Sequence, residues 1–131
     1  SIRAAQFRHG GVVFGPHPRS YAFRVPSKVV KLAMRSAVSG KLADSELFVV
    51  DNFDFEKPCT KQAEAFLKAL DITGRVTVVV NDEDVNAFLS FRNSKKANVI
   101  AASEINTYDL VDNATLVMTK DAVKYVEEVL S

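Results

Sequence analysis

The sequence predicts an α/β fold: a three-layer α/β/α sandwich with a four-stranded parallel sheet, preceded by an extended basic arm. Three observations predict it. Four short apolar runs rich in β-branched residues recur along the chain, and amphipathic segments of helical period separate them. The first 26 residues hold three of the five glycines and three of the four prolines. Because the apolar runs do not alternate with polar residues, we expect strands buried on both faces, as in a parallel sheet covered by helices.

Residues 1–26 are expected to form an irregular arm, because glycine and proline resist regular helix and sheet. The stretch GGVVFGPHPRSYAFRVPSK, residues 10–28, contains no acidic residue. Its apolar side chains are too many for a purely disordered tail, so we expect part of the arm to pack on the body. They are Val12, Val13, Phe14, Tyr21 and Phe23. The chain therefore divides into the arm, 1–26, and a globular α/β domain, 27–131.

A helix is expected from Ser27, which follows Pro26 and can act as the N-cap. Helical spacing places an apolar side opposite a basic side. The apolar side holds Val30, Ala33, Met34 and Ala37, and the basic side holds Lys28, Lys31 and Arg35. Such a helix can dock on a core while it presents cations outward.

The body then alternates strands and helices. Strands are expected in ELFVVD (46–51), VTVVV (76–80), NVIAA (98–102) and ATLVM (114–118). An i, i+3, i+4, i+7 face predicts a helix that contains Ala63, Phe66, Leu67 and Leu70. Further helices are expected over Glu83 to Phe91, as a short turn after Ser103, and from about Lys120 to Leu130 with Thr119 as a cap.

Formal net charge is +1, but the charges are divided unevenly along the chain. Residues 1–43 hold eight bases and no acid, while residues 44–131 hold the other nine bases and all sixteen acids. The first section is therefore +8 and the rest −7. This asymmetry favours a basic surface for nucleic acid or an acidic membrane. A solvated tail without a partner is the alternative.

Few residues suit catalysis or metal binding. The single cysteine, Cys59, cannot form an internal disulfide, and no apolar run reaches the roughly 20 residues of a membrane span. Cys59, His9 and His17 are the only thiol and imidazole side chains of the chain. Three such ligands are fewer than the four that a structural zinc site usually needs. We expect no metal and no cofactor.

A receiver-like phosphoacceptor or small-ligand site is the alternative function. It would use Asp51 or Asp82 with Thr119 and Lys120, which lie at or just after the carboxyl ends of predicted strands. The competing explanation is that Asp82 and Thr119 are helix N-caps. A third hypothesis is a regulatory module whose acidic body binds protein. No GxGxxG or GxxxxGK[ST] motif supports a nucleotide-phosphate cradle.

The stretch SIRAAQFRHGGVVFGPHPRSYAFRVPSKVVKLAMRSAVSGKL resembles the central part of the bacterial large-subunit ribosomal protein L four family. ELFVVDNF, KALDI, VVVND, FRN, ASEINTYDL and VMTKDAV also have counterparts there, in order. Departures are Ala5 where proline is usual, Phe7 where tryptophan is common, and His9 where glycine or a base is usual.

The resemblance implies a structural component of the large ribosomal subunit, without catalysis, that binds large-subunit ribosomal RNA and supports assembly. It implies neighbouring ribosomal proteins as partners and a place in the cytoplasmic ribosome. It implies no binding to a membrane or to DNA. Some bacterial members repress their own operon, which adds the protein's own leader mRNA to the expected partners. Relative to the family, we expect the chain to lack the N-terminal section and most of the extended loop.

The residues themselves agree with RNA binding, because arginine forks grip phosphates and unpaired bases stack on aromatic or guanidinium planes. The predicted RNA-binding residues are Arg3, Phe7, Arg8, His9, Arg19, Tyr21, Arg24, Lys28, Lys31 and Arg35. Packing on the body is an equal alternative for Phe7 and Tyr21. Lys41 is expected to contribute less, because it leaves the basic side of the helix.

Overall fold

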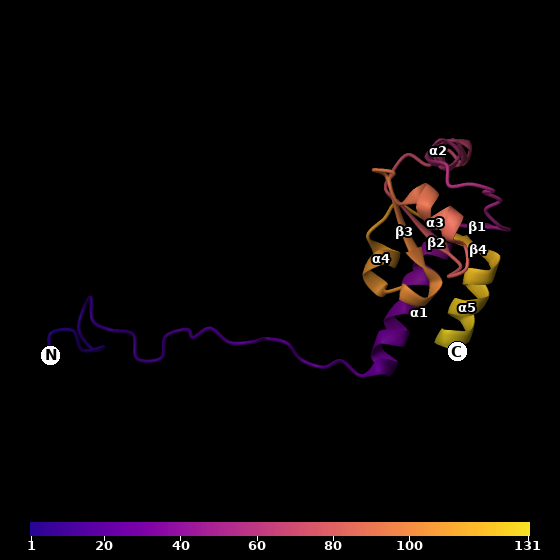
Figure 1. Ribbon diagram of the computed structural model, residues 1–131. Helices are drawn as coiled ribbons and strands as arrows, with labels where there is room; N and C mark the ends of the chain where they lie inside the picture. Colours follow the sequence, from indigo (N-terminus) through magenta and orange to yellow (C-terminus); the bar gives the residue numbers. More distant parts are fainter.

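Four parallel strands form the central sheet in the computed structural model of the chain, which describes residues 1–131 (Figure 1). The strands are β1 (Leu47–Val50), β2 (Val76–Val80), β3 (Ala97–Ala101) and β4 (Thr115–Thr119). Their order across the sheet is β1-β4-β2-β3, and every neighbouring pair is parallel. In this register Val78 of β2 lies between Val99 of β3 and Val117 of β4. The predicted parallel α/β sheet is confirmed.

Helices cover both faces of the sheet. On one face lie α1 (Ser27–Ala43), α4 (Thr107–Val111) and α5 (Lys120–Leu130), and on the other α2 (Thr60–Ala69) and α3 (Val85–Phe91). A 3₁₀ turn at Ala102–Glu104 links β3 to α4. None of the helices is both long and apolar enough to cross a lipid bilayer.

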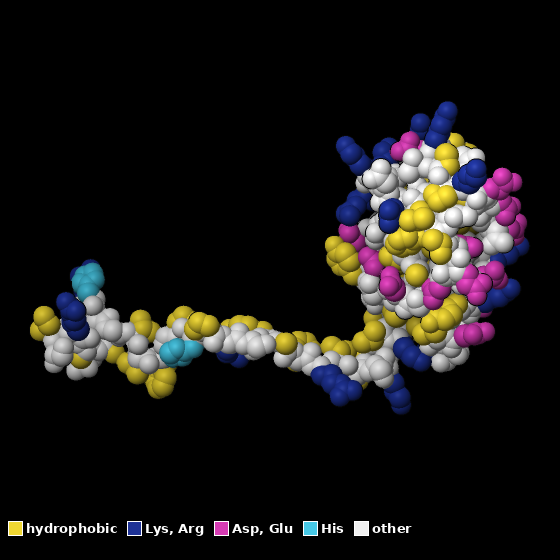
Figure 2. Space-filling model, viewed as in Figure 1, with side chains coloured by type: hydrophobic (Ala, Val, Ile, Leu, Met, Phe, Trp, Pro, Cys, Tyr) yellow, Lys and Arg dark blue, Asp and Glu magenta, His cyan; other side chains and the backbone are white.

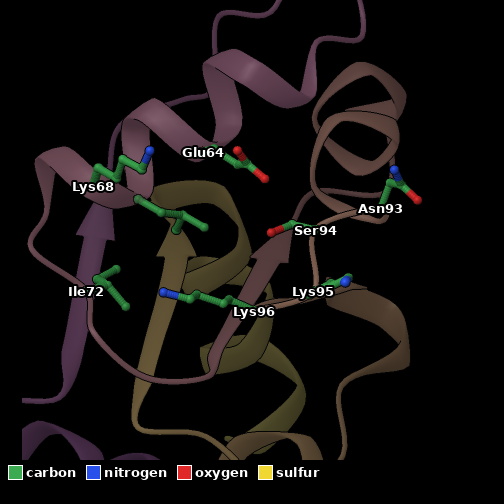
Figure 3. A pocket seen from close by; sticks show the side chains of 8 residues that line it. Glu64, Lys68, Ile72, Asn93, Ser94, Lys95 and Lys96 are labelled. Atoms are coloured by element: carbon green, nitrogen blue, oxygen red, sulfur yellow. The ribbon is translucent and has the colours of Figure 1, made fainter.

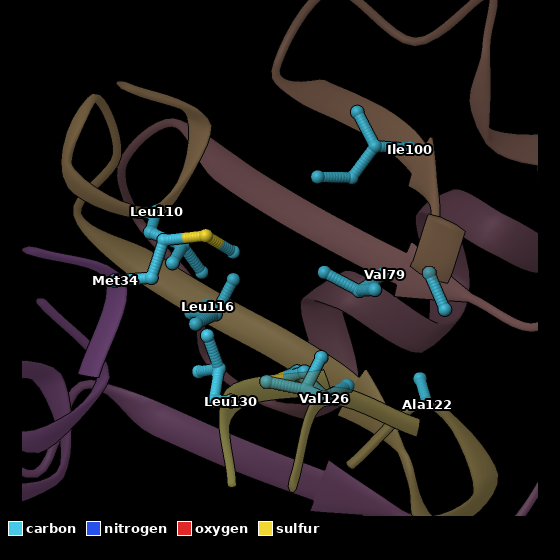
Figure 4. Packing of buried hydrophobic residues seen from close by; sticks show 10 residues of the cluster. Met34, Val79, Ile100, Leu110, Leu116, Ala122, Val126 and Leu130 are labelled. Atoms are coloured by element: carbon cyan, nitrogen blue, oxygen red, sulfur yellow. The ribbon is translucent and has the colours of Figure 1, made fainter. Parts of the chain in front are cut away.

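Two hydrophobic clusters hold the three layers together, and β2 contributes to both. Val79 lies in the first cluster, whereas Val78 and Val80 lie in the second, as expected when successive side chains of a strand point to opposite faces. Figure 4 shows the first cluster, in which α1, α4 and α5 meet the sheet. Its labelled members are Met34, Val79, Ile100, Leu110, Leu116, Ala122, Val126 and Leu130.

Several predicted helices are confirmed. The predicted face of α2 is turned inward, with Ala63 and Leu67 buried and Phe66 and Leu70 partly buried. The closing helix has its predicted bounds, and Thr119 caps it by accepting a hydrogen bond from the Ala122 amide at 3.3 Å.

The start of α1 differs from the prediction in two respects. Ser27 is the first helical residue and not the N-cap; the cap position belongs to Pro26, which has no side-chain acceptor. On the predicted apolar side, Met34 is buried and Ala37 partly buried, but Val30 and Ala33 are exposed. The reason is that the first turns of α1 project beyond the packed layers (Figure 1).

The prediction that every strand is fully buried is wrong for the two edge strands, β3 and β1. In β3, which pairs only with β2, Asn98 is exposed. At the other edge, β1 pairs only with β4. Phe48 and Val49 consequently remain 37% and 49% exposed.

Residues 1–26 contain no helix or strand, and Figure 1 shows them running away from the body as an extended segment. The prediction that part of the arm packs on the body is wrong, since Phe14 and Phe23 are 95% and 84% exposed. Beyond residue 11 the segment has only one hydrogen bond of its own, from the Ala22 amide to the Ser20 hydroxyl, so nothing folds it back. The division into an arm, 1–26, and a domain, 27–131, stays a prediction.

Candidate nucleic-acid interface

All ten predicted RNA-binding side chains are exposed, and none of their cations has a carboxylate partner. The four ion pairs of the chain all involve other bases: Lys41–Glu46, Arg75–Asp112, Lys120–Asp51 and Lys124–Asp121. In the view of Figure 2, basic side chains occur along the extended segment without acidic ones, and the acidic side chains gather on the body. The candidate surface is therefore cationic and unneutralised.

The first eleven residues form a loop of consecutive turns. The Gly11 amide donates to the Arg3 carbonyl at 2.9 Å and closes this loop, which also contains Phe7, Arg8 and His9. His9 adopts a left-handed φ of 62°. A side chain at Gly10 would overlap the backbone of the turn, so the loop requires glycine there. The loop thus presents two guanidinium groups, one imidazole and one aromatic ring close together in sequence.

Farther along, a cation and an aromatic ring are already stacked. The Arg19 guanidinium carbon lies 4.2 Å from the centroid of the Tyr21 ring. Tyr21 is 74% exposed and Phe7 53% exposed, so neither packs on the body. A guanidinium that stacks on a ring keeps its N–H donors in the plane, where they can still bind phosphate.

The start of α1 continues the cationic surface. Arg24, Pro26, Ser27 and Lys28 line a shallow hollow where the extended segment meets the helix. No acid lies in the first turn of α1, and Lys31 is exposed one turn further on.

Arg35 differs from the other candidates because it has a partner within the fold. Its Nη2 donates to the carbonyl oxygen of Leu130, at the end of α5. The last carbonyls of a helix lack partners in the helix and carry partial negative charge, so a cation there is stabilising. The geometry therefore assigns Arg35 a role in joining α1 to α5.

Lys41 lies apart from the basic side, as expected. Its ammonium donates to the Glu46 carboxylate at 2.6 Å and to the Asn113 carbonyl at 2.7 Å. The side chain is only 11% exposed.

The residues of the alternative small-ligand site make contacts within the fold. Asp51 forms an ion pair with Lys120, and the pKa of that ammonium is raised by its hydrogen bond and charge interaction with Asp51. Asp82 is not the N-cap of α3; its carboxylate accepts a hydrogen bond from the Ser103 amide at 3.3 Å, and Asp84 occupies the cap position.

The same end of the sheet carries further acids but no metal-binding group. Burial, and then the charges of Asp121 and Glu83, raise the pKa of Asp84. Nowhere do three or more His, Cys, Asp or Glu side chains come together as possible metal ligands.

The thiol–imidazole set is not assembled. Cys59 lies at the start of α2, where its amide donates to the Ser90 hydroxyl at 2.9 Å. Both histidines, cyan in Figure 2, lie on the extended segment.

Sequence reasoning missed a second group of cations. Lys68, Lys95 and Lys96 surround a hollow in the body, shown in Figure 3. The adjacent pair at 95 and 96 was the one available signal, and the net negative charge of the body obscured it.

Comparison with known proteins agrees with the resemblance. The family described as "Ribosomal protein L4/L1 family" matches residues 1–129. A curated relative, large ribosomal subunit protein uL4 of Symbiobacterium thermophilum, is 45% identical over 130 residues, which are 99% of this chain. The match spans 63% of the relative's length.

Proposed function

Because the chain belongs to the ribosomal protein L4/L1 family, we propose that it is a structural, non-catalytic component of the large ribosomal subunit. In this proposal it binds large-subunit ribosomal RNA through residues 1–26 and α1 and supports subunit assembly. The observation that carries the proposal is a row of six exposed cations with no carboxylate partner, in a section without acids. They are Arg3, Arg8, Arg19, Arg24, Lys28 and Lys31.

Electrostatics explains why such a surface suits RNA. Unopposed cations repel one another, and contact with a polyanion relieves this repulsion while counterions are released from the phosphates. The stacked pair of Arg19 and Tyr21 can receive an unpaired base, which is how proteins commonly contact irregular RNA.

The extended segment suits the same role. It makes few hydrogen bonds and leaves large apolar side chains exposed, including Phe14 and Phe23. Removal of this apolar surface from water is favourable, so a partner that covers these side chains stabilises the complex. In this proposal the arm, 1–26, lies along folded RNA and the domain, 27–131, is the scaffold.

Further partners follow from the family. We include neighbouring ribosomal proteins and the protein's own leader mRNA in the proposal, and a place in the cytoplasmic ribosome. Each is a separate hypothesis from the contact with ribosomal RNA.

Filter binding to large-subunit ribosomal RNA tests the main proposal. Lys28→Glu with Lys31→Glu should abolish binding, whereas Lys120→Ala and Asp82→Asn should leave it intact. For the unaltered chain, about six phosphate contacts predict a loss of affinity on the order of a thousandfold between 50 and 200 mM salt. A salt-independent affinity, or equal effects of the two sets of variants, would contradict the proposal.

A further inference from the structure

We propose that the hollow beside the start of β3 binds one nucleotide, with lysines on its phosphate and an apolar floor under its base. The inference rests on the proposed function in one respect, because we take an unpaired nucleotide of the bound RNA as its source. The hollow has a volume of about 390 Å³, within the roughly 300–1,000 Å³ of small-molecule sites.

Two segments far apart in sequence form the hollow. The end of α2 and the turn after it supply Leu67, Lys68 and Ile72, and the turn before β3 supplies Ser94 and Lys96. They meet because β2 and β3 are neighbours, and the Val76 amide donates to the Lys96 carbonyl at 2.9 Å. Figure 3 shows Lys96 reaching across toward Ile72, with Lys68 and Lys95 on opposite sides.

The lining combines the groups that a nucleotide needs. Leu67 is buried and Ile72 and Ser94 are partly buried, which gives an apolar floor with one hydroxyl group. The ammonium groups of Lys68, Lys95 and Lys96 are exposed around it. Flat bases bury apolar surface on such a floor, and ammonium groups bind phosphate as point charges.

None of these lysines has a counterion. Glu64 also lines the hollow and precedes Lys68 by one helical turn, yet no ion pair joins them. Three ammonium groups and one carboxylate leave a surplus of two positive charges. The carboxylate can accept a hydrogen bond from a ribose hydroxyl or a base amino group.

The hollow lies at the end of the sheet where the strands begin. All strands start at one edge of the sheet, which we call the amino edge, and end at the other, the carboxyl edge. At the amino edge the acids Glu46 and Asp112 are each paired with a base, Lys41 and Arg75. The acids Asp44 and Asp71 and the three lysines of the hollow have no ion-pair partner there.

At the carboxyl edge several acids are unpaired. Lys120 and Lys124 are each paired with an acid, Asp51 and Asp121. Asp82, Glu83 and Asp84, which follow β2, and Glu104, in the 3₁₀ turn after β3, have no basic partner. The hollow therefore lies at the edge of the sheet opposite these four acids.

Charge reversal with a matched control tests the inference in the intact chain. Lys95→Glu with Lys96→Glu changes the hollow. Lys57→Glu with Lys61→Glu makes the same charge change at exposed positions outside it. We expect the first variant to bind ribosomal RNA at least about tenfold more weakly than the control and to lose about two units of salt slope. Far-UV circular dichroism checks that both variants fold.

Two further measurements identify the source of the nucleotide. Ultraviolet cross-linking to the RNA, followed by peptide mass spectrometry, should yield adducts within residues 64–72 and 93–96. In a separate arm, ATP is titrated into the ¹⁵N-labelled chain. Amide shifts confined to residues 64–72 and 93–96, with RNA binding unaffected by the variant, would support the hollow as a nucleotide site and assign it to free nucleotide.

Equal RNA affinities of the two double variants, without cross-links and without ATP-dependent shifts, would overturn the inference. This failure differs from failure of the proposed function. In the latter case the unaltered chain does not bind ribosomal RNA at low salt, and the ATP titration still reports on the hollow.

Discussion

Replacing Arg35 by methionine tests whether this cation serves the fold or the RNA. The sequence places Arg35 on the basic side of α1, together with Lys31 one turn earlier. In the structure the Arg35 guanidinium donates to the Leu130 carbonyl, whereas Lys31 is exposed and has no partner. The two residues therefore form a matched pair with the same charge on the same helix.

The expected loss follows from the bond that Arg35 makes. A hydrogen bond from a charged donor contributes about 1.5–3 kcal/mol, and a cation at an exposed helix C-terminus about 0.3–1 kcal/mol. Since Arg35 is largely exposed, the lower values apply, and Arg35→Met should cost about 1 kcal/mol of unfolding free energy. For a domain of this size the melting temperature should fall by roughly 3–5 °C. Lys31→Met should stay within about 0.5 kcal/mol.

Urea unfolding followed by far-UV circular dichroism measures the stability of both variants, because the chain has no tryptophan. Salt-dependent binding to ribosomal RNA measures the other role. Lys31→Met should reduce the salt slope by roughly 0.7–0.9, the value of one phosphate contact, and Arg35→Met by less. If Arg35→Met is as stable as the unaltered chain and loses the same slope as Lys31→Met, the assignment of Arg35 to the fold is wrong.

Three further predictions concern the body. Phe91→Ala should cost about 3–5 kcal/mol in urea unfolding, because this fully buried ring packs against three other phenylalanine rings; a loss below about 1 kcal/mol would contradict that packing. Asp84→Asn should stabilise the fold at pH 7 by less than about 1 kcal/mol, because burial and the neighbouring carboxylates of Asp121 and Glu83 raise the pKa of Asp84 and disfavour its charge. Urea midpoints should show this gain shrinking as the pH falls toward the ordinary value of 3.8, and a gain that grows on acidification would reverse the sign. Thr119→Ala should cost about 1 kcal/mol in thermal unfolding by removing the cap of α5, and an unchanged melting temperature would exclude that role.

The sequence was most informative where local patterns determine structure. The run at 76–80 is apolar without alternation, and β2 is buried at all five positions. The cap at Thr119 and the bounds of α5 also follow from neighbouring residues alone. The exposure of β1 could not be predicted in this way, because LFVV resembles the buried runs. Only the order of the strands in the sheet makes β1 an outermost strand.

The candidate interface was less predictable because its details depend on contacts between distant residues. The exposed row of cations could be inferred from composition, but the partner of Arg35 lies 95 positions away. The hollow likewise needs the pairing of β2 with β3 to bring Lys68 close to Lys95 and Lys96. Apolar side chains in the arm suggested packing on the body. A sequence alone does not show whether an apolar side chain packs on its own domain or on a partner molecule.

The distribution of charge on the body also removes an apparent objection to RNA binding. A net charge of −7 over residues 44–131 would repel a polyanion if it were spread evenly. Ion pairs instead neutralise Glu46 and Asp112 at the amino edge, whereas four unpaired acids lie at the carboxyl edge, opposite the hollow. They are Asp82, Glu83, Asp84 and Glu104. At about 0.1 M salt, charges more than roughly 10 Å apart are largely screened from each other. The charge that a phosphate meets at the hollow is therefore mainly that of Lys68, Lys95, Lys96 and Glu64, and the acids at the carboxyl edge affect it less.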